Sequence, residues 1–468
     1  MPEARIDGGP TLHSPFAKLY TARLAPSNSC GPENAPWDKL APMGEIRRLA
    51  KPDMNSSRRT FLATALGGCV ATLAPTGAAA QFITKRSKML RWQTHRVAGI
   101  SHGYQVAVAD INGDGRPDIL ALSSVESVVE WYENSSWKAH PIATQTTKNI
   151  SLAPLFRPGY PARGLALATD FVLEDSRNGG DVWWAEPPLS GDSEWTLHFV
   201  GRVPTSHRLH WADLDGDGRL ELINAPLLGS GAEAPEYQVG APLTWYEMPE
   251  KLLEGHAAAG AARENAWTPH VIDDSLTVIH GICVMDWDGD GRDEILTASF
   301  EGVHLFQSTG QGNGLRWTKI RLAEGDQVSR PRRGSSEIAV GKVHGRRFLA
   351  TIEPWHGERV VAYFEGERGA LWTRHVIDNS FREGHALAVA DLDGDGNDEI
   401  VAGFRGGGTS LYVYYAADSA GGQWNRQTLD DQMAASGVVI ADVNGDGRPD
   451  IVAIGASTGN VKWYENLR

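Results

Sequence analysis

Five copies of an acidic, glycine-rich motif carry the clearest chemistry in this sequence of 468 residues. In each copy, Asp, Glu or Asn occupies positions 1, 3, 5 and 9, and glycines at positions 4 and 6 allow a sharp turn. Oxygen ligands at alternate positions of such a turn suit Ca²⁺, which takes roughly six to eight oxygens. The predicted ligands are Asp110, Asn112, Asp114, Asp118, Asp213, Asp215, Asp217, Glu221, Asp286, Asp288, Asp290, Glu294, Asp391, Asp393, Asp395, Glu399, Asp442, Asn444, Asp446 and Asp450.

The alternative for these loops is a set of Asp/Gly-rich turns without metal. Five copies in one register favour a cation, because without one each loop would hold about four acidic or amide groups in mutual repulsion. Short apolar and β-branched runs flank every copy and predict strands, whereas an EF-hand needs a helix on each side. We therefore expect up to five structural calcium ions, each in a loop between two strands.

A second set of residues stands six positions before the first aspartate of each loop. His207, His280 and His385 occupy this register, together with Tyr104 and Ser436. If these strands line a common channel, the loops lie at one mouth and the histidines converge at the other. Neutral imidazole serves as an acid, a base or a ligand for Zn²⁺ or another divalent metal. The alternative is that the histidines only bond to neighbouring loops.

Further candidates come from two repeats that lack the acidic loop. Glu353 and His356 lie in a Glu-Pro-Trp-His-Gly segment, and Arg332 and Arg163 precede what we take to be inner strands of these repeats. Arginine, tyrosine and histidine around an aromatic-walled hole suit a polyhydroxylated or carboxylated ligand. The arginine runs could instead be solvated loops.

Such a set of side chains fits an elimination reaction, which needs a base, an acid for the leaving oxygen and a donor that holds a carbonyl or carboxylate. The four histidines would supply base, acid or metal ligand, and Tyr104 a second acid. Arg163 and Arg332 would hold the carbonyl oxygen, and Glu353 would orient a histidine. An H-E-x-x-H motif, a phosphate-binding loop and a dinucleotide fingerprint are all missing from the sequence.

The spacing of the loops shows the elements that must position these residues. Asp391 and Asp442 are 51 residues apart, whereas the intervals from Asp110 to Asp213 and from Asp286 to Asp391 are about twice that. Two repeats therefore lack the loop, and the total is seven. In the loopless repeats we expect strands at 164–170 and 171–173, and at 338–343 and 348–350.

Each repeat also has an aromatic strand and a tryptophan that opens a further strand. The tryptophans are Trp92, Trp137, Trp195, Trp267, Trp317, Trp372 and Trp424. Four strands per repeat of about 50 residues predict an all-β, seven-bladed β-propeller over residues 92–468. The repeat region begins at residue 92 with an outermost strand, and the chain stops after an aromatic strand. The first strand should therefore complete the last blade. Histidines at the fourth position of Trp-x-x-His recur in this repeat and are expected to be structural.

The composition limits the partners. The formal charge of −14 comes largely from the loops, and the body of the chain has no basic stripe, which argues against nucleic acid. Of three cysteines, Cys283 alone lies in the body, so no disulfide framework is expected.

The N-terminal residues predict export. Arg58 and Arg59, a moderately apolar stretch and an Ala triplet make residues 54–80 typical of a twin-arginine signal peptide that leads to the periplasm or outside the cell. The stretch is too short and too rich in Gly and Ala for a stable membrane span. The alternative is a lipoprotein signal that ends at Cys69. Residues 1–53 are interpreted as a disordered or mis-assigned extension.

The repeats resemble FG-GAP/VCBS-type propeller repeats. The Trp-x-x-His-x-Ile strands, the inner-strand histidines and the segment at 353–357 resemble the propeller domain of the aldos-2-ulose dehydratase family. This resemblance implies removal of water from keto-sugars such as 1,5-anhydrofructose, and ulvan and rhamnogalacturonan lyases are further carbohydrate-acting propellers that use β-elimination.

We therefore expect an exported lyase or dehydratase that acts on a keto-sugar or uronate. The alternative is a non-catalytic adhesion or scaffold propeller that binds protein or glycan. The two hypotheses differ in whether the histidines share a pocket.

Overall fold

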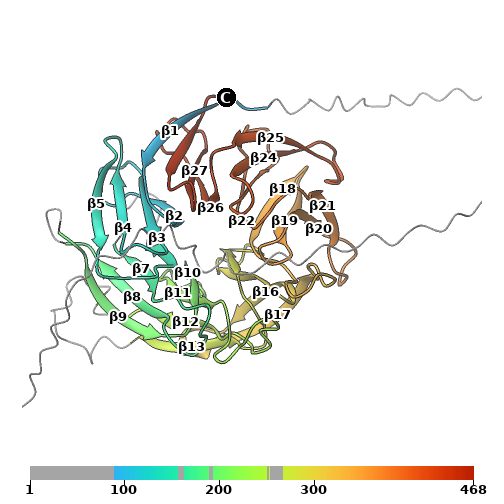
Figure 1. The fold of residues 1–468 in the computed structure, drawn as a ribbon. Coiled ribbons are helices and arrows are strands. Elements are labelled where there is room, and N and C mark those ends of the chain that lie inside the picture. Colours follow the sequence, from blue (N-terminus) through green and yellow to red (C-terminus); the bar gives the residue numbers. More distant parts are fainter. Residues whose placement is uncertain (1–88, 156–162, 189–192, 250–251, 253–266) are drawn as a thin grey trace, which may run out of the picture. The chain divides into compact units, whose positions relative to one another are not determined.

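Seven four-stranded antiparallel sheets form the blades of a propeller in the computed structural model, which describes residues 89–155, 163–188, 193–249, 252 and 267–468. The innermost strands contact one another in sequence order around the ring, and the last returns to the first. Figure 1 shows the seven sheets placed around a common centre. The predicted seven-bladed, all-β fold is confirmed.

The strands run outward in chain order within each blade. The innermost strands of blades 1 to 7 are β2 (Gly103–Ala109), β6 (Ser151–Pro154), β10 (Ser206–Ala212), β14 (Gly281–Met285), β18 (Ile338–Val343), β22 (Gly384–Ala390) and β26 (Ala435–Ala441). The second strands are β3 (Asp118–Ser123), β7 (Leu165–Thr169), β11 (Glu221–Pro226), β15 (Glu294–Ser299), β19 (Arg346–Glu353), β23 (Glu399–Phe404) and β27 (Asp450–Gly455).

The aromatic and tryptophan-led strands complete the blades as expected. The third strands are β4 (Val129–Glu133), β8 (Asp181–Glu186), β12 (Leu243–Glu247), β16 (Gly302–Thr309), β20 (Arg359–Phe364), β24 (Ser410–Ala416) and β28 (Val461–Asn466). The outermost strands are β5 (Lys138–Ala143), β9 (Thr196–Arg202), β13 (Thr268–Asp273), β17 (Arg316–Ala323), β21 (Thr373–Asp378), β25 (Trp424–Asp430) and β1 (Trp92–Ala98). A short 3₁₀ turn, η2 (Gly312–Gly314), joins β16 to β17.

The hydrophobic core lies between neighbouring blades. The second strands β3, β11, β15, β23 and β27 are buried along their whole length, which explains their continuous apolar sequences. One cluster joins blades 6 and 7 through residues such as Val401, Leu411 and Ile451, and others join blades 3 to 4, 4 to 5, 5 to 6 and 7 to 1. The outermost strands β13 and β21 contain only exposed and half-buried residues, as expected for strands at the rim of the blades.

The first strand closes the ring. β1 pairs antiparallel with β28, from Trp92 opposite Asn466 to Ala98 opposite Val461, and so becomes the outermost strand of blade 7. This confirms the predicted completion of the last blade by the first strand.

Two asparagines at the ends of aromatic strands, the buried Asn466 and the half-buried Asn134, link neighbouring blades. The Asn466 side chain donates to the carbonyl oxygens of Leu392 in blade 6 (2.8 Å) and Pro449 in blade 7 (3.1 Å). Asn134 donates in the same way to Val443 O in blade 7 and to Pro117 O in blade 1, both at 2.8 Å. Each asparagine therefore bridges the acidic loop of its own blade and that of the preceding blade.

Blade 2 differs from the prediction. Its inner strand is β6, and the segment expected to be the inner strand, 164–170, contains the second strand β7. Residues 171–173, expected to form a strand, are irregular. β6 has only four residues and no aspartate to mark its end, so the repeat was assigned one strand too late. In blade 5, β18 and β19 contain the expected strands.

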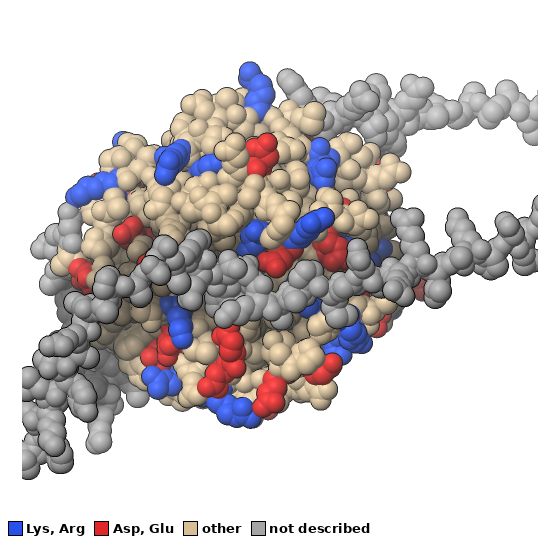
Figure 2. Space-filling model, in the orientation of Figure 1, with Lys and Arg blue, Asp and Glu red and all other residues tan. Residues whose placement is uncertain are grey.

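The remaining observations concern the surface and the termini. On the face drawn in Figure 2, acidic and basic side chains of the described residues are interspersed. Among the described residues, none of the helices reaches the length and apolarity that crossing a membrane requires. The predicted extension 1–53 and signal peptide 54–80 lie outside the described residues.

Candidate functional site

The histidine register lies at the N-terminal ends of the inner strands. Tyr104, His207, His385 and Ser436 are each the second residue of their strand, and His280 directly precedes β14. All five are buried. The acidic loops follow the other ends of these strands, so the two sets of residues stand at opposite ends of the inner strands, as expected.

The backbone turn that precedes the register is repeated. Residues His102, Thr205, Val278 and Glu383 have φ between 50° and 60° and stand two positions before Tyr104, His207, His280 and His385, respectively. Non-glycine residues, and β-branched ones above all, rarely adopt this left-handed conformation. Its recurrence in four blades shows that the surrounding structure imposes the turn and so fixes where each register side chain begins.

Tyr104 bridges two of the histidines. Its hydroxyl lies 2.8 Å from Nε2 of His207 and 3.2 Å from Nε2 of His385. The guanidinium of Arg208 lies 3.2 Å from the same His207 nitrogen and 5.7 Å from the centre of the Tyr104 ring. Because Arg208 can only donate, His207 Nε2 is an acceptor, and Nδ1 of this histidine carries the proton.

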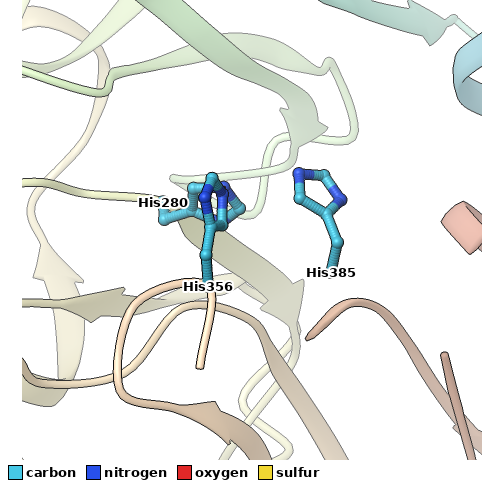
Figure 3. A group of neighbouring side chains, drawn as sticks. All are labelled: His280, His356 and His385. Atoms are coloured by element: carbon cyan, nitrogen blue, oxygen red, sulfur yellow. The ribbon is translucent and has the colours of Figure 1, made fainter. Parts of the chain in front are cut away.

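Three histidines form a compact group beside Tyr104. His356, from the loop between β19 and β20, places Nε2 at 2.8 Å from Nε2 of His280. His280, His356 and His385 each offer a ring nitrogen within 4.8 Å of the others. Figure 3 shows the three imidazoles close together, each carried by a different part of the chain. The histidines therefore share a pocket, which is the observation that separates the two functional hypotheses.

Backbone carbonyls set the tautomers of two of these rings. Nδ1 of His280 lies 3.1 Å from Ser336 O, and Nδ1 of His385 lies 2.6 Å from Ser436 O. A carbonyl only accepts, so each Nδ1 carries a proton and each Nε2 presents a lone pair to the group. Two lone pairs directed at one space fit a divalent metal of the zinc type, which binds neutral imidazole.

Burial keeps the imidazoles neutral. It lowers the pKa of His207, His356 and His385 well below the ordinary value, and positive charge on Arg208 or Arg405 acts in the same direction. Burial also lowers the pKa of His280, but Glu337 opposes that shift. The group therefore offers bases and metal ligands at neutral pH rather than imidazolium ions.

Three charged residues of the site were missed in the sequence. Arg208 and Glu337 form an ion pair of 2.8 Å beside the histidines, and the guanidinium of Arg405 lies 5.8 Å from the Tyr104 ring centre. Burial opposes the charge of Arg208, but Glu337 and Tyr104 outweigh it and raise the pKa of this arginine. Arg208 directly follows the register histidine of β10, and this position was the available signal; Arg405 follows β23 without any repeat signal.

Open space adjoins the group along the channel. A cavity of about 120 Å³, open to solvent, is lined by Tyr104, Arg208, Glu337, His385 and Ser436 together with neighbouring inner-strand residues. The cavity thus brings a phenol, an imidazole, a guanidinium and a carboxylate to one surface, which suits a polar ligand.

The structure separates the remaining predicted site residues. Arg332 lies on the histidine side and donates to the backbone oxygen of His356 at 3.3 Å. Glu353 accepts from Ser335, Thr351 and Tyr363 and pairs with Arg374 at 2.8 Å, so its recorded partners include no histidine.

The placement of Arg163 is wrong. This exposed residue precedes β7 rather than the inner strand β6, in the β6–β7 connection that corresponds to the acidic loops of other blades. It therefore belongs to the opposite end of the inner strands from the histidines.

Comparison with known proteins supports the resemblances expected from the sequence. Residues 179–366 match the β-propeller domain of aldos-2-ulose dehydratase. Residues 391–453 match an FG-GAP-like repeat and 102–124 an FG-GAP repeat, so the predicted resemblances are confirmed. The dehydratase-type segment contains His207, Arg208, His280, Glu337 and His356.

Two curated relatives match part of the chain. Aldos-2-ulose dehydratase of Phanerodontia chrysosporium is 25% identical over 307 residues, which cover 60% of this chain and 32% of the relative. Rhamnogalacturonan exolyase YesX of Bacillus subtilis (strain 168) is 29% identical over 178 residues, 28% of each chain. The chain thus spans about a third of the length of the relatives it matches.

The loops of the FG-GAP repeats have one internal geometry. In the loop at 391–399, Asp391 accepts from the N–H groups of Gly394 (2.7 Å) and Gly396 (3.0 Å), and Glu399 accepts from Leu392 N (2.8 Å). The other four loops repeat these three bonds. Carboxylate oxygens of positions 1 and 3 and of either 5 or 9 approach within 4.8 Å of one another in three loops.

Burial and crowding disfavour charge on the ninth loop residue. Burial, together with the neighbouring loop aspartates, raises the pKa of Asp118 and Asp450 to about 6, of Glu221 and Glu294 to about 7, and of Glu399 to about 9. A bound cation would relieve this repulsion, so the donor set fits Ca²⁺.

Proposed function

We propose that this protein is a carbohydrate-acting lyase or dehydratase that eliminates water or an alkoxide from a keto-sugar or uronate. The observation that carries the proposal is the group of four buried histidines beside an open cavity, in which Tyr104 contacts His207 and His385 and the other two, His280 and His356, contact each other. The relatives, one named a dehydratase and the other an exolyase, support the same reaction class.

Elimination removes a proton from carbon beside a carbonyl or carboxylate and protonates the leaving oxygen. Neutral imidazole can accept the first proton, and the buried histidines are held in that form. The Tyr104 hydroxyl is positioned to donate to a leaving oxygen. His207, whose Nε2 accepts in the resting site, would take the proton from carbon at this nitrogen and return it to Tyr104. Arg208, which lines the cavity, would hold the carbonyl or carboxylate oxygen, and Arg332 would support it from the His356 loop.

A divalent metal such as Zn²⁺ fits the group of His280, His356 and His385. When bound, such a metal would polarise the carbonyl oxygen of the substrate. The protein residues orient these ligands through Ser336 and Ser436, and Tyr104 remains available for proton transfer.

We also propose structural roles for the acidic loops and the N-terminal segment. The five loops would bind up to five Ca²⁺ ions, with side chains at positions 1, 3, 5 and 9 as ligands. Export by the twin-arginine route would deliver the protein to the periplasm or beyond, with lipidation at Cys69 as the alternative.

An absorbance assay tests the proposed reaction, because elimination creates a conjugated enone or unsaturated uronate that absorbs in the near ultraviolet. Wild type, His280→Ala and Tyr104→Phe would be tested on 1,5-anhydrofructose, glucosone, 3-keto-glycosides and polyuronates with calcium and zinc present. His198→Ala is a matched control, since His198 pairs with Glu186 on the outer side of blade 2.

We expect absorbance to grow with wild type and the control and to fall at least about 100-fold in rate with either site variant. A full rate in His280→Ala would remove this histidine from the mechanism. If no substrate responds to wild type, the reaction is rejected and the non-catalytic glycan- or protein-binding propeller is preferred.

A further inference from the structure

Glu337 stands between two parts of the histidine site. It directly precedes β18 of blade 5, and its side chain is 15% exposed. Its Oε1 lies 3.0 Å from Nδ1 of His280 and 2.8 Å from the terminal nitrogen of Arg208. One carboxylate oxygen therefore accepts from a guanidinium of blade 3 and lies within ion-pair distance of the Nδ1–H of an imidazole of blade 4, which also contacts Ser336 O.

His385 provides an internal comparison. Nδ1 of His385 is held by the carbonyl of Ser436, just as Nδ1 of His280 is held by the carbonyl of Ser336. Of these two rings, His280 is the one for which the structure shows a carboxylate near Nδ1. Two equivalent histidines thus differ by one acidic residue, which indicates a purpose beyond holding the ring in place.

We propose that Glu337 is a positioning residue that acts together with the Ser336 carbonyl to hold the Nδ1–H tautomer of His280, and that its negative charge makes His280 Nε2 the strongest electron donor of the group. This inference rests on the proposed function and deepens it, because it assigns a specific task within the same site. A carboxylate that accepts from one ring nitrogen locks the tautomer and increases the basicity of the other nitrogen. His280 Nε2 faces His356 at 2.8 Å, so the added basicity is delivered to the centre of the histidine group.

Arg208 keeps Glu337 in this role. The ion pair at 2.8 Å holds the carboxylate between the two blades, and burial, opposed by Arg208 and His280, leaves the pKa of Glu337 below its ordinary value. Arg208 also contacts His207 and Tyr104, so one network joins all the proposed proton-transfer groups.

Two measurements test the role without relying on activity. The first is the nitrogen chemical shift of the His280 ring in protein labelled with ¹⁵N at histidine, the signal being assigned by its loss in His280→Ala. The second is zinc affinity, measured by competition with a chromophoric chelator. Both measurements would be made on wild type, Glu337→Gln and Asp378→Asn. Asp378→Asn is the control, because it removes a carboxylate with a buried side chain from an ion pair with Arg426 at the end of the outermost strand β21.

In wild type we expect a single Nδ1–H tautomer of His280. In Glu337→Gln the signal should move toward a tautomer mixture and zinc affinity should fall by about 10- to 100-fold, whereas Asp378→Asn should leave both unchanged. An unchanged tautomer and affinity in Glu337→Gln would overturn the proposal.

The double variant Glu337→Gln/Arg208→Gln distinguishes the proposed role of Glu337 from a purely structural one, because it removes both partners of the Glu337–Arg208 ion pair. If Glu337 served only as the counter-ion of Arg208, the double variant would restore the wild-type tautomer and zinc affinity, and this result would also overturn the proposal. The same double variant is used if Glu337→Gln does not fold. If wild type binds no zinc, the metal part of the proposed function fails, and the His280 tautomer alone decides the role of Glu337.

Discussion

Replacing Asn466 by alanine tests whether the links between blades contribute measurably to stability. The Asn466 side chain is fully buried and donates to Leu392 O and Pro449 O. Alanine removes both donors, but Arg468 also donates to Leu392 O at 3.1 Å. The Pro449 carbonyl then loses its hydrogen bond. The backbone N–H of Arg468 also loses its acceptor, Asn466 Oδ1 at 3.2 Å, but this residue is exposed and its N–H can bond to water. An unsatisfied buried carbonyl costs about 1–3 kcal/mol, so we expect a loss of about 2 kcal/mol in the free energy of unfolding.

Asn134 offers a matched comparison. It makes the equivalent two bonds, to Pro117 O and Val443 O, and no arginine is recorded on either carbonyl. Asn134→Ala should therefore cost more than Asn466→Ala, about 2–4 kcal/mol. Asn425→Ala, at an exposed position of β25, should change stability by less than about 0.5 kcal/mol.

The assay is urea unfolding followed by tryptophan fluorescence, with the melting temperature as a second measure. The reasoning is refuted if Asn466→Ala and Asn134→Ala both behave like Asn425→Ala, because the carbonyls would then have found other partners. A larger loss for Asn466→Ala than for Asn134→Ala would refute the compensation assigned to Arg468.

Further predictions concern the loops and export. Removing calcium with EDTA should lower the melting temperature by several degrees, since ligands that bind only the folded state stabilise it, and elemental analysis should find up to five calcium ions; absence of both effects would reject the calcium sites. In calcium-free protein, the stability that comes from the raised pKa of Glu399 is present below its ordinary value of 4.5 and lost as the pH rises toward about 9. The calcium-free protein should thus melt lower at pH 9 than at pH 6, and added calcium should reduce the difference. Replacing Arg58 and Arg59 by Lys should keep the protein in the cytoplasm, and continued export would contradict the twin-arginine route.

Much of the fold could be predicted because each blade repeats its signals. The spacing of loop aspartates and the recurring tryptophans gave the number of blades and the closure by β1, which the pairing of Trp92 with Asn466 bears out. The exception, blade 2, has a four-residue inner strand without a loop aspartate, so nothing in the sequence distinguished β6 from β7. The incorrect placement of Arg163 on the histidine side of the inner strands follows from that error.

The convergence of the site could be predicted where it follows the repeat, whereas His356 and Arg332 were found from segments of a repeat without the acidic loop. Tyr104, His207, His280 and His385 occupy one register, so their convergence could be expected from the strand geometry. Arg405 comes from a turn after β23, and its approach to Tyr104 depends on how blades 6 and 1 are brought together by the ring.

Glu353 shows the opposite case. Its place next to His356 in the sequence suggested contact with a histidine, but the end of β19 directs the carboxylate to Arg374 and Tyr363. The closeness of Glu353 to His356 in the sequence therefore did not predict which residues the Glu353 side chain would contact.

The closure of the ring by β1 also has a consequence during synthesis on the ribosome. β1 is made before blades 1 to 6, and β28, its partner, is made after them. Throughout that time β1 is an edge with open hydrogen-bonding groups, which invites pairing with other nascent chains. The run Gln93-Thr94-His95-Arg96 places polar and charged side chains along this strand. The polar and charged side chains of β1 thus disfavour pairing with other chains before β28 has been made.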